Sequence, residues 1–151
     1  MRIIAAEKMG YYPTPSKTLD CVAQLIRPAV KGGSFRLLDP CAGQGEALSY
    51  VADALARQGA HVQTYGVELS HVRAELAARV LEQCICADWA DMTCAHKGFS
   101  LLWLNSPYDS EAGQAGTHKR RLEEVFLQNT LKTLQPGGVL GYIVPLKLPG
   151  M

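Results

Sequence analysis

The stretch LLDPCAGQGEAL, residues 37–48, predicts a strand that turns through a glycine-rich loop into a helix. Its apolar start ends at Asp39, and Gly43 and Gly45 permit a tight turn before a helix that begins near Glu46. Two glycines alone are weak evidence, because many turns between a strand and a helix contain them. Asp39 narrows the choice of ligand. The phosphate-loop pattern G-x-x-x-x-G-K-[ST] is absent, and a carboxylate here would repel phosphate and suit a cationic or hydroxyl-bearing ligand.

The rest of the chain repeats this alternation of strand and helix. Short apolar runs predict buried strands at Phe35–Leu38, Val62–Val67, Cys84–Ala87, Phe99–Leu104 and Val139–Val144. Apolar residues at helical spacing predict helices over Ser16–Val30, Glu46–Gln58, Ser70–Glu82 and Arg121–Leu134. The last of these helices is expected to be stopped by QPGG, residues 135–138. This order predicts a doubly wound, mostly parallel α/β sheet in a single domain over residues 1–151. Its ligand is expected beyond the carboxyl ends of the strands.

The composition excludes several classes of protein. With 48% hydrophobic and 19% charged residues, the chain is typical of a folded globular domain, and 151 residues suffice to bury a core. The net charge of +1 gives no support to nucleic-acid binding by the whole surface, so such a function has to rest on a site. No apolar run is long enough to span a bilayer, so no membrane partner is expected.

The chain has five cysteines, an odd number that cannot all pair in disulfides, and they lie within apolar or helical segments. The cysteines therefore predict reduced thiols and a cytoplasmic protein. A zinc site formed by Cys84, Cys86, Cys94 and His96 is conceivable because these residues are close in sequence. The C-x-C spacing and the strand-like surroundings favour buried thiols instead, so no metal is expected.

Acidic residues also follow the second and third predicted strands. Glu68 ends the second strand, where a carboxylate can accept hydrogen bonds from both hydroxyls of a ribose, although a helix dipole also favours an acidic residue there. After the third strand, Asp88 can accept a hydrogen bond from an adenine amino group and Trp89 can stack on the ring. The alternative is a surface turn with a half-buried tryptophan. Together with Asp39, these carboxylates fit a ligand with a ribose, an adenine and a cationic tail but no phosphate, which is S-adenosylmethionine.

Three motifs resemble those of S-adenosylmethionine-dependent methyltransferases. DPCAGQG, residues 39–45, is similar to their glycine-rich first motif in the D-P-x-x-G-x-G form of amino-methyltransferases. NSPY, residues 105–108, resembles their catalytic tetrapeptide [DNS]-P-P-[YFW], and YYPTP, residues 11–15, resembles the T-P segment of N6-adenine DNA methyltransferases with the gamma motif order. The resemblance covers nearly the whole chain and is nearest to the uncharacterised adenine-methyltransferase-like proteins of bacteria and mobile elements. It implies a Rossmann-like methyltransferase fold with S-adenosylmethionine as cofactor.

The strand ends and the resemblance together define the expected cofactor site. By resemblance, the T-P segment helps to hold the methionine end of the cofactor. The glycine loop and the residues after the strands complete the site. The expected cofactor-binding residues are Tyr12, Thr14, Pro15, Asp39, Pro40, Cys41, Ala42, Gly43, Gly45, Glu68, Leu69, Asp88, Trp89 and Asn105.

The resemblance assigns catalysis to Asn105, Ser106, Pro107 and Tyr108. An exocyclic amine on a heteroaromatic ring has a delocalised lone pair, and two acceptors that hold its hydrogens can free that pair for attack. The Asn105 side-chain oxygen and the Ser106 carbonyl are the expected acceptors. Pro107 fixes the turn, and Tyr108 stacks on the base, which contributes about 1–3 kcal/mol. Taken alone, the four residues also fit a turn that ends a strand.

The implied activity is methyl transfer to an exocyclic amino nitrogen, in the first place N6 of an adenine flipped out of DNA. Guanine amines in RNA and glutamine amides in proteins are alternatives, because the same tetrapeptide serves enzymes that act on them. A catalytically inactive binding module is a third alternative. It is supported by the short length and by Ser106, which replaces the family's proline and removes the rigidity of a double proline.

Two further features bear on partners. The basic cluster HKRR, residues 118–121, is expected either to contact a phosphate backbone or to be an ordinary charged surface. The sequence ends directly after the fifth predicted strand, so we expect a fold truncated there, without a target-recognition domain. An exposed edge at that strand would pair readily, so a second copy or a partner chain is expected to cover it.

Overall fold

The computed structural model describes residues 11–105 and 122–144. Its elements are α2 (Ser16–Leu25), β1 (Ser34–Asp39), α3 (Glu46–Ala56), β2 (His61–Glu68), α4 (His71–Ala77), β3 (Gln83–Cys86), η1 (Trp89–Asp91), β4 (Phe99–Leu104), α5 (Leu122–Thr130), η2 (Leu131–Thr133) and β5 (Leu134–Tyr142). The expected catalytic residues Ser106, Pro107 and Tyr108 and the basic cluster 118–121 lie outside the described residues.

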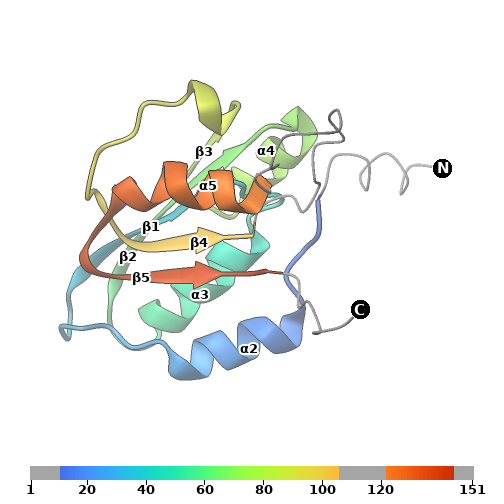
Figure 1. The fold of residues 1–151 in the computed structure, drawn as a ribbon. Helices are drawn as coiled ribbons and strands as arrows, with labels where there is room; N and C mark the ends of the chain where they lie inside the picture. The colour runs from blue at the N-terminus through green and yellow to red at the C-terminus, as the bar shows by residue number, and fades with distance from the viewer. Residues whose placement is uncertain (1–10, 106–121, 145–151) are drawn as a thin grey trace, which may run out of the picture.

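The described strands form one sheet in the order β3-β2-β1-β4-β5, and every pairing is parallel (Figure 1). β1 is central, with β2 paired along its whole length on one side and β4 paired at Leu37 and Leu38 on the other. The chain moves outward from β1 to β3 and then returns to form β4 beside β1. The predicted parallel α/β sheet is therefore confirmed. Ligands of such sheets bind where the strand order reverses, which here is between the carboxyl ends of β1 and β4.

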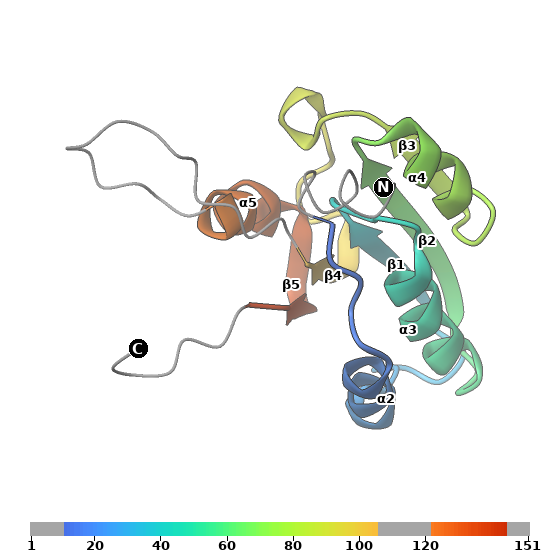
Figure 2. The ribbon, with the colours of Figure 1, turned by 90° about the vertical axis from the view of Figure 1, so that its right-hand side faces the viewer.

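Two hydrophobic clusters fill the two faces of the sheet. The edge-on view in Figure 2 shows α5 on one side of the sheet and α2, α3 and α4 on the other. Successive strand residues point to opposite faces, so Leu37 and Leu38 enter different clusters. On one face α2, α3 and α4 supply buried residues that include Leu19, Leu48, Val51, Leu55 and Ala77. On the other face α5 and the segment around η1 cover the sheet, with Trp89, Phe99 and Leu102 among the buried residues.

All four predicted helices end earlier than their sequence patterns suggested: the second, expected to reach Gln58, ends at Ala56, and the third, expected to reach Glu82, ends at Ala77. The first was expected to reach Val30 but ends at Leu25, since Pro28 disfavours a helical conformation of the residue before it and lacks a backbone N–H. The last was expected to reach Leu134 but ends at Thr130 and continues as η2. Residues 135–138, expected to stop this helix, instead lie inside β5, where the register shifts between Phe99 and Leu101 of β4.

The third and fifth strands are less buried than expected. β3 and β5 are the outer strands of the described sheet, so each has a neighbouring strand on one side only. Ile85 of β3 is 48% exposed and Val139 of β5 is 52% exposed. Their apolar sequences resemble those of buried strands, but position in the sheet, which the sequence pattern does not contain, decides burial. In the described ranges no helix is long and apolar enough to cross a membrane.

Candidate functional site

Seven of the predicted site residues line one pocket at the carboxyl edge of the sheet, and three of the seven end or directly follow a strand. Asp39 ends β1, Glu68 ends β2 and Asn105 directly follows β4. These strands are neighbours, so their ends lie side by side. The pocket is lined by Tyr11, Tyr12, Pro13, Thr14, Asp39, Cys41, Ala42, Glu46, Ala47, Glu68, Arg73, Trp103 and Asn105.

The glycine-rich loop connects β1 to α3 in a left-handed backbone conformation. Gly43 has a φ of 57° and Gly45 a φ of 80°, values that favour glycine. The two glycines face different surroundings. A Cβ at Gly43 would overlap the ring of Tyr11, at the pocket, whereas a Cβ at Gly45 would lie 2.9 Å from Val80 and 3.2 Å from Ala77. Gly45 therefore permits close packing of the loop on α4, and Gly43 is the glycine that faces the pocket.

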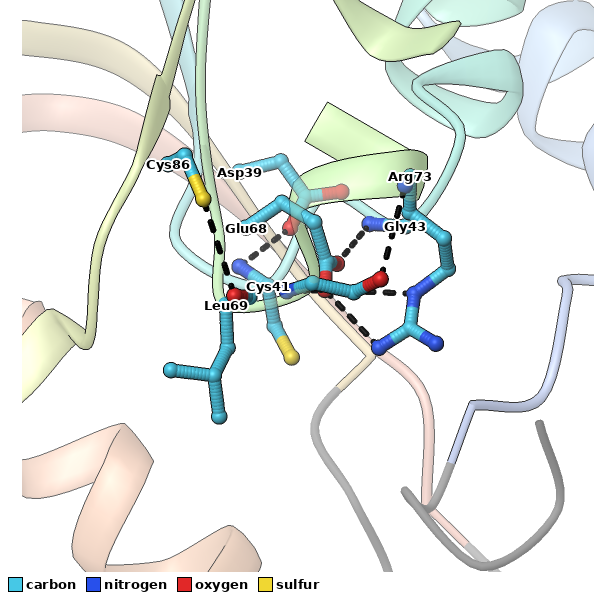
Figure 3. Close-up of polar contacts among 8 residues, drawn as sticks. Asp39, Cys41, Gly43, Glu68, Leu69, Arg73 and Cys86 are labelled. Carbon is cyan, nitrogen blue, oxygen red and sulfur yellow. Dashed lines mark hydrogen bonds and ion pairs between the residues drawn. The ribbon is translucent and has the colours of Figure 1, made fainter. Parts of the chain in front are cut away.

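Glu68 is buried, and its carboxylate is the centre of a hydrogen-bonding network (Figure 3). Oε2 accepts a hydrogen bond from the Gly43 amide at 2.7 Å. Oε1 accepts from the Ser70 amide at 2.9 Å and from Nε and Nη2 of Arg73 at 3.1 and 2.8 Å. Oε1 thus accepts three of these bonds and Oε2 accepts one, whereas each carboxylate oxygen has about two acceptor sites. Ribose hydroxyls can therefore bind Oε1 only if Arg73 gives up its bonds.

Arg73 and Tyr11 form the wall of the pocket above Glu68, and the sequence analysis assigned neither of them. The Arg73 guanidinium carbon lies 4.9 Å from the centre of the Tyr11 ring, within the range of a cation–π interaction. A signal for Arg73 was present in the sequence: it lies in the first turn of α4, where the helix dipole disfavours a cation. A cation at such a place indicates a nearby anion, which the structure shows to be Glu68.

Asp39 is as deeply buried as Glu68, with 3% of its surface exposed. Its Oδ1 accepts a hydrogen bond from the Cys41 amide at 2.9 Å. Among the described residues no basic side chain lies within ion-pair distance of it. Burial raises the pKa of Asp39 to about 7, the Cys41 hydrogen bond lowers it, and the nearby charge of Glu68 raises it further.

Asn105 is held by the T-P segment. Its Nδ2 donates hydrogen bonds to the Tyr12 carbonyl at 2.9 Å and to Oγ1 of Thr14 at 3.1 Å. The segment that precedes α2 therefore reaches across the pocket to the end of β4. The predicted T-P segment and the first residue of the predicted catalytic tetrapeptide are in contact, although about 90 residues separate them in the sequence.

The described residues fit S-adenosylmethionine in their chemistry. A buried carboxylate that lacks a cationic neighbour suits the ammonium end of the ligand, and a second carboxylate suits the ribose hydroxyls. The main-chain amides of a left-handed glycine loop can approach a ligand closely. The site also has a constraint, because the Tyr11 ring lies against Gly43 and Arg73 lies against Glu68. Both side chains border the space that the cofactor needs.

Other predicted site residues lie at the border of this pocket or away from it. Pro15 is the residue directly before α2, Pro40 is buried at the start of the loop after β1, and Leu69 is exposed just after Glu68. Asp88 is exposed and caps η1, accepting a hydrogen bond from the Ala90 amide at 2.9 Å. Trp89 is buried in the hydrophobic cluster below α5, so the structure does not present its ring for stacking on an adenine. The local sequence could not show this, because the turn after β3 directs the ring into the core.

Cys41, Cys84 and Cys94 have pKa values raised above that of an ordinary thiol. Burial is the largest cause for Cys41, whose pKa rises to about 12, and for Cys84, whose pKa rises to about 11. Both thiols are therefore protonated at neutral pH and are poor nucleophiles and metal ligands. In the part of the chain that the structure describes, no three histidine, cysteine or acidic side chains are grouped to hold a metal ion.

A comparison with protein families finds one match that spans nearly the whole chain. The model of the uncharacterised methyltransferase family DUF6094 matches residues 1–148. The curated proteins give no significant match.

Solved structures with a similar fold include two that are described as methyltransferases. A Listeria monocytogenes protein described as a class I S-adenosylmethionine-dependent methyltransferase has a TM-score of 0.73 and 20% identity, over 90% of this chain and 47% of its own. The methyltransferase subunit of a type I restriction-modification system from Streptococcus thermophilus has a TM-score of 0.69 and 22% identity, over 89% of this chain and 34% of its own. The chain thus has the fold of these enzymes and spans half or less of their length. This agrees with the Rossmann-like fold expected from the sequence.

Proposed function

The chain belongs to this family of uncharacterised methyltransferases, and from that premise we propose that it binds S-adenosylmethionine at Asp39 and Glu68 and methylates an exocyclic amino nitrogen. The acceptor that we propose first is N6 of adenine in DNA. One observation carries the proposal: Asn105, the residue proposed to activate the amine, lines the same pocket as the two buried carboxylates. A cofactor held by the carboxylates would therefore lie beside the amide.

The carboxylates have different roles in this proposal. Asp39, buried and without a basic neighbour among the described residues, takes the cationic ammonium of the methionine end. Glu68 accepts the ribose hydroxyls after Arg73 has moved from its Oε1 atom. The main-chain amide of Gly43 remains bound to the other oxygen of Glu68 and keeps that side chain in place.

The amide of Asn105 acts on the acceptor rather than on the cofactor. When bound, the cofactor supplies an electrophilic methyl group. Asn105 accepts a hydrogen of the target amine through its side-chain oxygen, and the Ser106 carbonyl is proposed to accept the other. Holding both hydrogens turns the nitrogen lone pair out of conjugation, so the contribution of the protein is orientation and electrostatics. Ser106 and the stacking residue Tyr108 lie outside the described residues, so their roles rest on the sequence resemblance.

DNA is the proposed partner on two grounds. The T-P segment, which resembles that of N6-adenine DNA methyltransferases, contacts Asn105. In addition, one protein of similar fold is the methyltransferase subunit of a restriction-modification system. Guanine amines in RNA and glutamine amides in proteins remain alternative acceptors that the same assay separates. A second copy or a partner chain that pairs with the outer strand β5 is also part of the proposal.

Calorimetric titration of the 151-residue chain with S-adenosylhomocysteine tests the cofactor site. We expect saturable binding with one ligand per chain. A folded sample that binds none would contradict the assignment of Asp39 and Glu68.

Transfer of a labelled methyl group to unmethylated DNA, RNA and protein tests the acceptor. Asn105→Ala should abolish transfer while S-adenosylhomocysteine still binds. Asn129→Ala, the same change on the exposed side of α5, is the matched control and should leave transfer unchanged. If wild-type activity survives Asn105→Ala undiminished, the proposed catalytic role of the amide is wrong.

A further inference from the structure

The contact between Asn105 and the T-P segment is more specific than packing. The Asn105 amide nitrogen has two acceptors on this segment, the Tyr12 carbonyl at 2.9 Å and Thr14 Oγ1 at 3.1 Å. Both bonds lie within the normal range for N–H···O hydrogen bonds. The two acceptors are two residues apart in the segment, so together they can accept both hydrogens of one amide NH₂ group.

An asparagine at this place needs such a constraint. The oxygen and the nitrogen of its amide have nearly the same shape, and a half-turn about the last side-chain bond exchanges them. Only the oxygen can accept a hydrogen from a target amine, whereas the amide nitrogen would direct its own hydrogens at that amine. The same side chain is therefore productive in one orientation and obstructive in the other.

The T-P segment selects between these two orientations. A main-chain carbonyl can only accept a hydrogen bond, so the Tyr12 carbonyl requires the amide nitrogen and not the oxygen. The Thr14 hydroxyl accepts a hydrogen bond from the same nitrogen. Because a hydroxyl can also donate, Thr14 holds the side chain in place while the carbonyl selects its orientation. Since the nitrogen faces the segment, the amide oxygen points away from it.

We propose that Thr14 is a positioning residue, which together with the Tyr12 carbonyl holds the Asn105 amide so that its oxygen faces the target amine. This inference rests on the proposed function, and it differs from the role that the sequence resemblance gave the T-P segment, which was to hold the methionine end of the cofactor. In this proposal Thr14 acts through Asn105, so its loss lowers turnover and leaves cofactor affinity nearly unchanged.

The prolines of the segment make it suitable for this task. Pro13 and Pro15 follow the two residues that supply the acceptors, and a residue before proline is restricted to extended conformations. Pro15 itself has a φ of −59° and a ψ of 143°, and α2 begins directly after it. Tyr12 and Thr14 therefore lose little conformational entropy when they bind Asn105, because the backbone is already extended.

Two substitutions at one position test the proposal kinetically. Thr14→Val keeps the size and branching of the side chain but removes the acceptor, and Thr14→Ser restores the hydroxyl. We expect Thr14→Val to lower kcat about tenfold, the equivalent of one hydrogen bond, and to change the Kd for S-adenosylhomocysteine less than twofold. Thr14→Ser should recover most of the kcat. Thr18→Val, on α2, is the matched control and should match the wild type.

The orientation of the amide can also be measured without activity. In protein labelled with ¹⁵N-asparagine, the side-chain NH₂ signals of Asn105 are identified by their loss in Asn105→Asp. We expect Thr14→Val to shift one of the two proton signals upfield and to speed its exchange with water, and Thr14→Ser to do neither. This result would support the positioning role even in a chain that transferred no methyl group, so the two proposals can fail separately.

Two results would overturn the inference. One is a Thr14→Val variant with wild-type kcat and unchanged Asn105 NH₂ signals. The other is a Thr14→Val variant whose affinity for S-adenosylhomocysteine falls by as large a factor as its kcat. That result would mean that Thr14 binds the cofactor rather than positioning Asn105.

Discussion

Asp39 and Glu68 are two carboxylates in nearly the same place with opposite local chemistry. Each ends a central strand, and they are 3% and 4% exposed. Glu68 accepts four hydrogen bonds, two of them from the guanidinium of Arg73. Asp39 accepts one from a backbone amide, and burial raises its pKa to about 7.

The difference indicates that equal burial does not mean an equal role. A buried charge with a bonded cation and several donors is compensated, and removing it leaves the cation unpaired. A buried charge without a cation destabilises the folded state unless it is protonated or a ligand brings the cation. Glu68 is therefore compensated within the protein itself, whereas Asp39 is the carboxylate to which we assign the positive group of the proposed ligand.

The largest expected effect is that of Glu68→Ala on stability. Arg73 would lose its carboxylate partner, and the Gly43 and Ser70 amides would lose their acceptor. We expect the free energy of unfolding in urea to fall by about 3 kcal/mol. Glu75→Ala removes an exposed glutamate of α4 and should change it by less than about 0.5 kcal/mol. If Glu68→Ala and Glu75→Ala lowered the free energy of unfolding equally, the hydrogen bonds of Glu68 would contribute no more to stability than an exposed ion pair.

The next effect is a pH dependence of stability that belongs to Asp39. Its pKa is raised from 3.8 to about 7, so between these values the folded chain holds a proton that the unfolded chain releases. The stabilisation due to this proton is complete below pH 4 and is lost as the pH rises to about 7, with a slope of at most about 1.4 kcal/mol per pH unit. Asp39→Asn should lack this component and be more stable than the wild type at pH 8. Urea unfolding from pH 5 to 8 measures it, and parallel curves for the two proteins would refute it.

Cofactor binding should show the reverse dependence on pH. The ammonium of S-adenosylhomocysteine requires an ionised Asp39, so we expect affinity to rise up to about tenfold per pH unit below pH 7 and to level off above it. At pH 8, Asp39→Asn should bind at least about tenfold more weakly, a loss of about 1.4 kcal/mol. Calorimetry across this range tests both statements. A wild-type affinity that is constant with pH would place the ammonium elsewhere.

The smallest effect concerns Ser70, which contributes to the Glu68 network mainly through its backbone. Its side chain caps α4 with a long hydrogen bond of 3.5 Å from the Arg73 amide, whereas its own amide donates to Glu68. Ser70→Ala keeps the amide, so we expect a loss of only about 0.5 kcal/mol in the free energy of unfolding. A loss as large as that of Glu68→Ala would mean that the cap, and not the carboxylate, organises this corner.

Residues that depend on local pattern were predicted well, and those that depend on packing were not. The glycine loop and its Asp39 were assigned from a dozen residues, because turn chemistry and strand ends are local features. Trp89 was expected to face a ligand but lies in the core, and Arg73 and Tyr11 were not assigned although they line the pocket. What a side chain contacts depends on elements that are distant in the sequence.

The sequence by itself determined the alternation of strands and helices, and with it a parallel sheet whose strands carry acidic residues at their carboxyl ends. Periodicity, turn residues and caps are encoded within about 15 residues, so they can be read without the fold. Only the tertiary structure decided that β4 returns to lie beside β1, and this order brings Asn105 to Asp39 and the T-P segment to Asn105. Strand order depends on how both faces of the sheet bury their apolar surface together, and no single stretch of the chain contains that information.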